Sequence, residues 1–165
     1  MYDREQEMYP EVIEWFRNYL SAYHKRSKIE VFNTSQLLLS RFLETKDYHR
    51  CFREYLTFEI KVDITGIIRT QKRAFLCFIE CKLKPITLKD ISQLLGYSRV
   101  AQPLYSLIIS PRGISKSMNY LLKTFNRYDV LKYNEEKSIR VASWDYIKRE
   151  IDIRTLLPPG KFLAK

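Results

Sequence analysis

The sequence predicts an α/β fold with a mixed central β-sheet flanked by helices. Segments with apolar residues at helical spacing alternate along the chain with segments that are alternating or continuously apolar. That order of elements is consistent with a single sheet covered by helices on both faces. No repeat or shift in composition divides the 165 residues. We therefore expect one domain over residues 1–165, with a core over about 10–110 and a C-terminal helix and β-hairpin extension over about 115–165.

Helices are expected from apolar spacing and from the residues that begin or end helices. The first covers residues 10–23, where Val12, Phe16 and Leu20 share a face and Pro10 lies in the first turn, which tolerates proline. The others run from a cap at Thr34 or Ser35 to about residue 43, from a cap at Thr87 to about residue 100, over residues 115–128, and over a short stretch around 144–151.

Strands are expected where the apolar period falls to two or where an apolar run is short and continuous. Residues 58–64 alternate strictly, which places Glu59, Lys61 and Asp63 on one face. Gly66 is expected to mark a bulge, and residues 70–73 a hairpin turn before the nearly all-apolar run 74–82. Further strands are expected over 29–32 and 104–110, and a hairpin is expected to pair 130–133 with 138–141.

The chain is strongly basic, with 29 Lys and Arg against 19 Asp and Glu and a net charge of +10. Such a surplus favours a polyanionic partner, because neutralised phosphates release their condensed counterions. A basic surface without a specific partner is the alternative. DNA is the expected partner, and the candidate phosphate contacts are Lys25, Arg26, Lys28, Lys84, Lys89 and Arg99.

The composition argues against several other classes. The three cysteines and two histidines lack metal-ligand spacing, which argues against a zinc or iron–sulfur site. No apolar run approaches the roughly 20 residues of a membrane helix. The polar first residues do not resemble a secretory signal. We expect no membrane partner and a soluble cytoplasmic protein, in the host cytoplasm if the source is viral.

Charged residues at the end of an apolar strand indicate a reactive site. Glu80 and Lys82 are two positions apart and therefore share a face, and a hairpin that turns near Gln71 brings Asp63 close to Glu80. Two adjacent carboxylates repel unless a cation lies between them, and hard oxygen ligands suit Mg²⁺ or Mn²⁺. Lys82 is placed to position or deprotonate an attacking water and to offset charge on a phosphate. Together these groups predict a metal-assisted phosphodiester hydrolase.

These residues also carry a family resemblance. Val62-Asp63 followed by Glu80-Cys81-Lys82 at a strand end resembles the signature of the PD-(D/E)XK nucleases, whose fold is the restriction-endonuclease-like one. Gln93 and Tyr97 on the next expected helix match the QxxxY motif of the RecB-type branch. The resemblance covers residues 10–110. It departs from the family pattern at Val62, where a proline is usual, and in lacking the four-cysteine cluster of one subgroup.

The resemblance implies a DNA nuclease dependent on Mg²⁺ or Mn²⁺, either an exonuclease or a structure-directed endonuclease. It assigns the metal to the carboxylates of Asp63 and Glu80 and to the main-chain carbonyl of Cys81, and it makes Lys82 the catalytic lysine. Gln93 and Tyr97 would orient the site or contact DNA. A glutamate of the first helix is usual in the family, and Glu14 is the first candidate with Glu11 next. A homodimer is also expected, since small nucleases of this type often dimerise.

Two other functions are compatible with parts of the sequence. Residues 87–98 resemble the first half of a helix-turn-helix, and residues 115–141 resemble a helix followed by the β-hairpin wing of a winged helix. Such a protein would be a DNA-binding regulator without catalysis. Pro103 and the β-rich run after it would interrupt the recognition helix of such a protein. The remaining alternative is a catalytically inactive nuclease fold that only binds nucleic acid or a partner.

Overall fold

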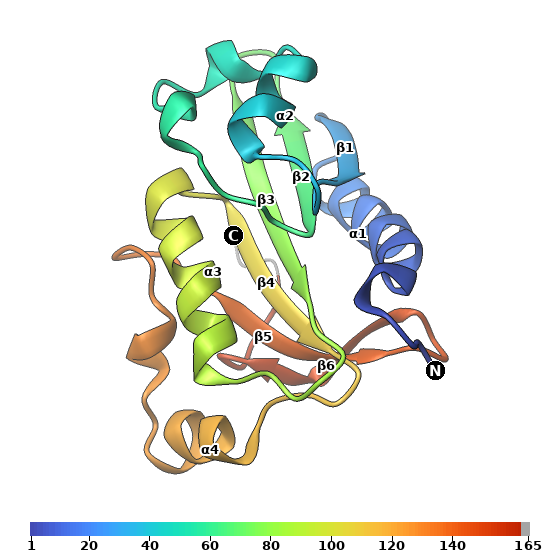
Figure 1. Ribbon diagram of the computed structural model, residues 1–165, viewed down its shortest axis with the longest axis vertical. Helices are drawn as coiled ribbons and strands as arrows, with labels where there is room; N and C mark the ends of the chain where they lie inside the picture. Colours follow the sequence, from blue (N-terminus) through green and yellow to red (C-terminus); the bar gives the residue numbers. More distant parts are fainter. Residues whose placement is uncertain (163–165) are drawn as a thin grey trace.

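A computed structural model describes residues 1–162, and its centre is one six-stranded mixed sheet in the order β1-β2-β3-β4-β5-β6 (Figure 1). The strands are β1 Lys28–Asn33, β2 Ile64–Arg69, β3 Ala74–Cys81, β4 Tyr105–Ser110, β5 Arg140–Asp145 and β6 Glu150–Leu157. The β3–β4 and β4–β5 pairs are parallel and the other pairs are antiparallel. The expected α/β class with a mixed sheet flanked by helices is therefore confirmed.

Helices cover both faces of this sheet (Figure 1). The α-helices are α1 Tyr9–Tyr23, α2 Leu39–Thr45, α3 Leu88–Ala101 and α4 Lys116–Asn119, which continues as the π-helical turn η4 Tyr120–Thr124. Short 3₁₀ turns are η1 Glu5–Glu7, η2 His49–Cys51, η3 Tyr55–Thr57 and η5 Tyr128–Leu131. One buried cluster joins α1 to the sheet, and a second joins α2, α3 and α4 to the opposite face.

The α1 face is packed closely at Gly66. Val12, Phe16 and Leu20 of α1 are fully buried, as the helical spacing predicts. A Cβ at Gly66 would lie 3.2 Å from the Phe16 ring and 3.3 Å from Cys77 Cβ. Gly66 pairs in regular register with both neighbouring strands. The predicted bulge is therefore wrong, and the glycine instead allows the helix to approach the sheet.

The alternating run 58–64 forms a strand only from Ile64 onward. Phe58, Ile60 and Val62 are buried as the alternation predicts, but their backbone runs past the end of the sheet. The carbonyl of Ile60 accepts a hydrogen bond from the Leu39 amide at 2.8 Å. Carbonyl groups of this segment thus accept hydrogen bonds from amides in the first turn of α2, which have no partner within the helix.

The start of α2 also differs from the prediction. The helix begins at Leu39, and neither Thr34 nor Ser35 caps it. The Thr34 hydroxyl is instead buried, where it donates to the Val62 carbonyl at 2.6 Å. A tertiary hydrogen bond therefore takes the side chain that local sequence assigns to a helix cap.

The C-terminal extension belongs to the same sheet. The predicted helix around residues 144–151 is wrong, because Trp144 lies buried in β5 and a turn leads from there into β6. The predicted hairpin of 130–133 with 138–141 is reduced to η5 and a single bridge between Lys132 and Ser138. The helix expected over 115–128 ends at Thr124. The last three positions of the expected extension lie outside the described residues.

The crossover between the parallel strands β3 and β4 is α3. Thr87 begins this helix as predicted, and its amide donates to the Asp90 carboxylate at 2.8 Å in a capping box. The chain passes from α3 directly into β4, so the position of a recognition helix in a helix-turn-helix is occupied by a central strand. Among residues 1–162, none of the helices is long and apolar enough to cross a membrane.

Candidate active site at the ends of β2 and β3

The register of the β2–β3 hairpin brings Asp63 opposite Glu80. Ile64 pairs with Ile79, so the next position of the antiparallel pair joins the residue before β2 to the penultimate residue of β3. The turn at Thr70–Arg73 closes the hairpin through a hydrogen bond from the Thr70 amide to the Arg73 carbonyl at 2.8 Å. The proximity predicted from counting residues about the turn is therefore present in the fold.

Asp63 is held from two directions. The Tyr9 hydroxyl, on the first residue of α1, donates to Asp63 Oδ1 at 2.8 Å. The Cys81 amide donates to Asp63 Oδ2 at 2.9 Å. Each oxygen keeps a free lone pair, because a carboxylate accepts about four hydrogen bonds or metal bonds. The carboxylate is thus oriented while it remains able to bind a cation.

Glu80 is buried and incompletely satisfied. Its side chain extends from the face of β3 that packs against α3, and the residue is only 5% exposed. Its Oε1 has no hydrogen-bond partner, and its Oε2 lies 3.7 Å from Lys82 Nζ. Burial, followed by the negative charge of Asp63 and a hydrogen bond with it, raises the pKa of Glu80 to about 9. Without a cation, Glu80 therefore carries a proton at neutral pH.

Lys82 stays charged in this environment. Burial lowers its pKa, but the surrounding carboxylates of Glu80, Glu5, Asp63 and Asp90 outweigh burial and raise the pKa above its usual value. A charged ammonium donates hydrogen bonds and does not accept a proton. Of the two roles that the sequence left open for this lysine, the raised pKa is consistent with positioning and charge stabilisation rather than deprotonation of water.

Glu5 is the acidic residue near the site that sequence reasoning missed. It is half-buried in η1, and its negative charge raises the pKa values of Tyr9, Cys81 and Lys82. The family resemblance places a glutamate in the first helix, whereas Glu5 precedes that helix. No spacing in the sequence indicates its proximity to Lys82, which the path of the N-terminus creates.

The two predicted glutamates of α1 face another groove. Glu11 accepts a hydrogen bond from the Tyr2 hydroxyl, and its Oε1 lies 3.3 Å from Arg149 Nε. Glu14 is exposed and, with Glu11 and Arg149, lines a groove of about 480 Å³ beside the β5–β6 turn. The structure therefore does not bring Glu11 or Glu14 together with Asp63 and Glu80.

Gln93 and Tyr97 interact with each other on α3. Gln93 Nε2 donates to the Tyr97 hydroxyl at 3.0 Å, as residues four apart on a helix allow. Gln93 is exposed, and the half-buried Tyr97 packs against the core. Among the described residues, neither side chain hydrogen-bonds to Asp63, Glu80 or Lys82. The first turn of α3 lies near the site, since Asp90 contributes to the pKa of Lys82.

The predicted phosphate contacts separate into two regions. All six side chains are exposed, and Lys28 forms an ion pair with Glu30 at 3.2 Å. Lys84 and Lys89 flank the start of α3 and are close in sequence to Lys82. Lys28 pairs with Arg69 in the β1–β2 register, which places the Lys25–Lys28 loop at the opposite end of the sheet. Arg99 lies in the last turn of α3.

The residues present fit Mg²⁺ or Mn²⁺. Residues 1–162 contain no group of three or more His, Cys, Asp or Glu side chains placed to hold a metal. Mg²⁺ keeps several waters and is often held by one or two carboxylates with substrate phosphates, so two carboxylates and a main-chain carbonyl suffice. The unpartnered oxygen of Glu80 and its repulsion by Asp63 are both relieved by a cation between them.

Comparisons with known proteins identify no relative. No family model, no curated protein and no solved structure matches the chain.

Proposed function

We propose that this protein is a Mg²⁺- or Mn²⁺-dependent DNA nuclease with a restriction-endonuclease-like core. The observation that carries the proposal is the convergence of Asp63, Glu80 and Lys82 at one end of the β2–β3 hairpin. A buried carboxylate that has one oxygen without a hydrogen-bond partner, beside a second carboxylate and a charged lysine, destabilises a fold unless it binds a ligand. The net charge of +10 supports a polyanionic substrate.

Each residue of the site has a distinct task in this proposal. When bound, the metal would polarise a phosphoryl oxygen and make water more acidic. Asp63 and Glu80, with the Cys81 carbonyl, would hold it, and Tyr9 and the Cys81 amide fix the direction of the Asp63 carboxylate. The Lys82 ammonium would orient the attacking water and stabilise negative charge that develops on the phosphate.

The test is cleavage of end-labelled single- and double-stranded DNA with Mg²⁺, Mn²⁺ or EDTA. The wild-type protein is expected to cut only with a metal. Glu80→Gln and Lys82→Ala are expected to lower the rate at least about 10²–10³-fold, the loss typical of a group that stabilises transition-state charge. Glu59→Gln removes an exposed carboxylate four positions before Asp63 and serves as the matched control.

Salt-sensitive DNA binding is expected to survive in both site variants. A folded Lys82→Ala protein that cuts at the wild-type rate would contradict the role of this lysine. Tight binding without cutting under any metal would instead favour an inactive nuclease fold. The product ladder distinguishes exonuclease from endonuclease action, and the mass in solution tests the predicted homodimer.

A further inference from the structure

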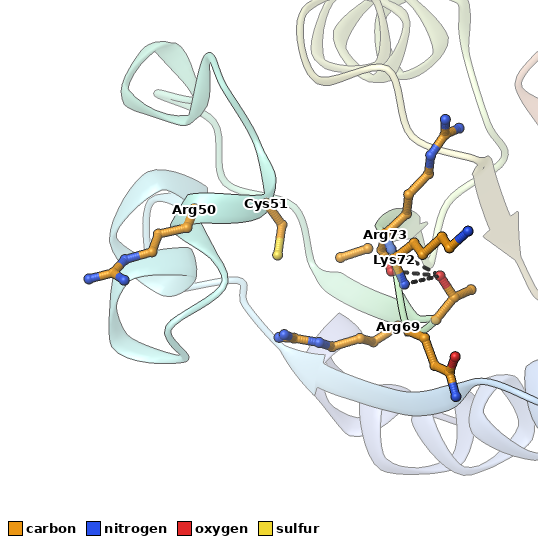
Figure 2. Close-up of a pocket in the computed structure, with 8 residues that line it drawn as sticks. Arg50, Cys51, Arg69, Lys72 and Arg73 are labelled. Carbon is orange, nitrogen blue, oxygen red and sulfur yellow. Dashed lines mark hydrogen bonds between the residues drawn. The ribbon is translucent and has the colours of Figure 1, made fainter.

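A cavity lined by cationic side chains lies at the turn of the β2–β3 hairpin, at the end opposite Asp63 and Glu80. It has a volume of about 450 Å³ and lies between η2 and the turn (Figure 2). Arg50, Arg69, Lys72 and Arg73 line it together with Cys51, and no carboxylate does. We refer to it as the basic cavity. Its lining concentrates positive charge from two segments that are far apart in the sequence.

The four cations of the basic cavity have no anionic partner within the described part of the chain. Two exposed arginines elsewhere have a local carboxylate partner, Arg127 with Asp129 at 2.8 Å and Arg154 with Asp152 at 2.9 Å, whereas others in the described residues, such as Arg17 and Arg41, have none. No such ion pair involves the cations that line the basic cavity. Like charges around one concave surface repel one another, and an anion in the cavity removes that repulsion.

The hairpin turn fixes the backbone that carries Lys72 and Arg73, and a ring contact places Arg69. Thr70 Oγ1 accepts hydrogen bonds from the Arg73 amide at 3.0 Å and the Lys72 amide at 3.3 Å, which fixes the turn. Arg69 lies over the Tyr48 ring, 5.5 Å from its centre. Figure 2 shows Cys51 and Arg69 facing the space between the two segments, with Lys72 and Arg73 projecting from the turn. A fixed set of donors suits a phosphate ligand.

We infer that the basic cavity binds backbone phosphates of DNA at a distance from the cleavage site. This inference rests on the proposed function, which identifies the anion as DNA. Arg69 projects from the face of β2 that carries Ile67, and Glu80 from the face of β3 that carries Phe78, so both belong to the α2–α3 side of the sheet. Arg69 lies six positions after Asp63, or roughly 20 Å at about 3.3 Å per residue, which corresponds to about six base pairs. The exposed Lys25 and Arg26 extend the same basic end.

The first test measures DNA affinity as a function of salt in EDTA, where no cleavage occurs. The variant Lys72→Gln/Arg73→Gln is compared with Arg17→Gln/Lys148→Gln. The control also removes one exposed lysine and one exposed arginine, but from α1 and the β5–β6 turn. Each lost phosphate contact lowers the salt slope by about 0.9. The salt slope of the cavity variant is expected to fall by about two units, and its DNA affinity by roughly tenfold per lost contact near 0.1 M salt. The control variant is expected to keep both the wild-type salt slope and the wild-type affinity.

The second test uses Cys51 as a reporter of occupancy. Cys51 is exposed, whereas Cys77 and Cys81 are buried, so alkylation by neutral iodoacetamide reports on the cavity. A 20-base-pair duplex is expected to slow this reaction several-fold, and inorganic phosphate at matched ionic strength is not. Cys51→Ser gives the background, and Arg17→Gln/Lys148→Gln is expected to keep the protection.

The outcomes separate this inference from the proposed function. Equal salt slopes in the two double variants, or alkylation of Cys51 that DNA leaves unchanged, would overturn the basic cavity as a DNA site. Equal protection by inorganic phosphate would assign the cavity to a small phosphate ligand and overturn the backbone assignment. Because both measurements are made without metal, a protein that binds DNA through the cavity but never cuts it would sustain this inference and contradict the nuclease.

Discussion

The two ends of the β2–β3 hairpin carry opposite charges in opposite environments. At one end, Glu80 is buried and lies beside Asp63. These surroundings raise the pKa of Glu80 to about 9, so its carboxyl group is protonated at neutral pH. At the other end, Arg69, Lys72 and Arg73 are exposed to solvent. One short pair of strands thus separates the candidate metal site from the surface proposed to bind a polyanion.

The difference shows two ways in which a fold can hold charged side chains. The acidic end does so through tertiary contacts, since Tyr9, Asp63 and Cys81 meet from three segments. The basic end does so through exposure and a local turn. Substitutions at the acidic end should therefore have large effects concentrated in single residues, whereas those at the basic end should be small and spread over several.

The largest expected effect is the pH dependence of stability that Glu80 introduces. Its pKa is about 9 in the folded protein and near 4.5 when unfolded, so folding takes up a proton between those pH values. The free energy of unfolding should then fall as pH rises through this window, by at most about 1.4 kcal/mol per pH unit. Denaturant unfolding in EDTA from pH 5 to 9 measures it.

Glu80→Gln should flatten this profile, because glutamine does not titrate. His24 acts with the opposite sign, since burial lowers its pKa and stability rises as it loses its proton, and the subtraction of the two profiles removes its contribution. Adding Mg²⁺ should stabilise the wild-type protein more at pH 8 than at pH 6, because metal binding requires the deprotonated carboxylate. Identical profiles for the two proteins would show that Glu80 is ionised in the metal-free fold.

The next effect concerns the positioning of Asp63. Tyr9→Phe removes the hydroxyl that donates to Asp63 Oδ1 and keeps the ring in the core. Groups that orient a metal ligand typically contribute 10–100-fold to metal affinity or activity, and we expect a loss of about that size in Mn²⁺ binding by calorimetry.

Tyr19→Phe is the matched control, because Tyr19 lies ten positions further along α1, where its ring stacks on Tyr23. Cleavage by Tyr9→Phe should recover part of its rate at high metal concentration, as expected for weakened binding with intact chemistry. Wild-type Mn²⁺ affinity in Tyr9→Phe would show that the Cys81 amide alone orients the carboxylate.

The same contrast explains what could be predicted from sequence. Asp63, Glu80 and Lys82 were found because a buried strand that ends in charge is a local signal, and the hairpin register follows from the turn. The first helix, the third helix and the strands β1, β3 and β4 were predicted for similar reasons, because their apolar periods are unambiguous. Glu5 was missed because only the tertiary path of the N-terminus brings it near Lys82.

The basic cavity and the C-terminal strands were missed for a related reason. The segment that carries Arg50 and Cys51 lies beside the hairpin turn only after the insertion between β1 and β2 has folded, and no spacing in the sequence reports that proximity. Residues 144–151 have helical spacing, but Trp144 and Ile151 pair across β5 and β6. Burial in the α1-side core therefore decides the structure there against local periodicity.

The smallest expected effect tests the basic end. Thr70→Val removes the hydroxyl that accepts from the Lys72 and Arg73 amides, while it keeps every cation of the basic cavity. We expect a loss of about 1 kcal/mol in stability, the usual contribution of such hydrogen bonds, and only a few-fold loss in DNA affinity with the salt slope unchanged.

Thr45→Val, which removes an exposed hydroxyl bonded to the Arg41 carbonyl in α2, is the control. Fluorescence anisotropy with a 20-base-pair duplex measures the difference. A loss of DNA binding as large as that of Lys72→Gln/Arg73→Gln would mean that turn geometry dominates, and the basic end would then resemble the acidic end in depending on fixed positions.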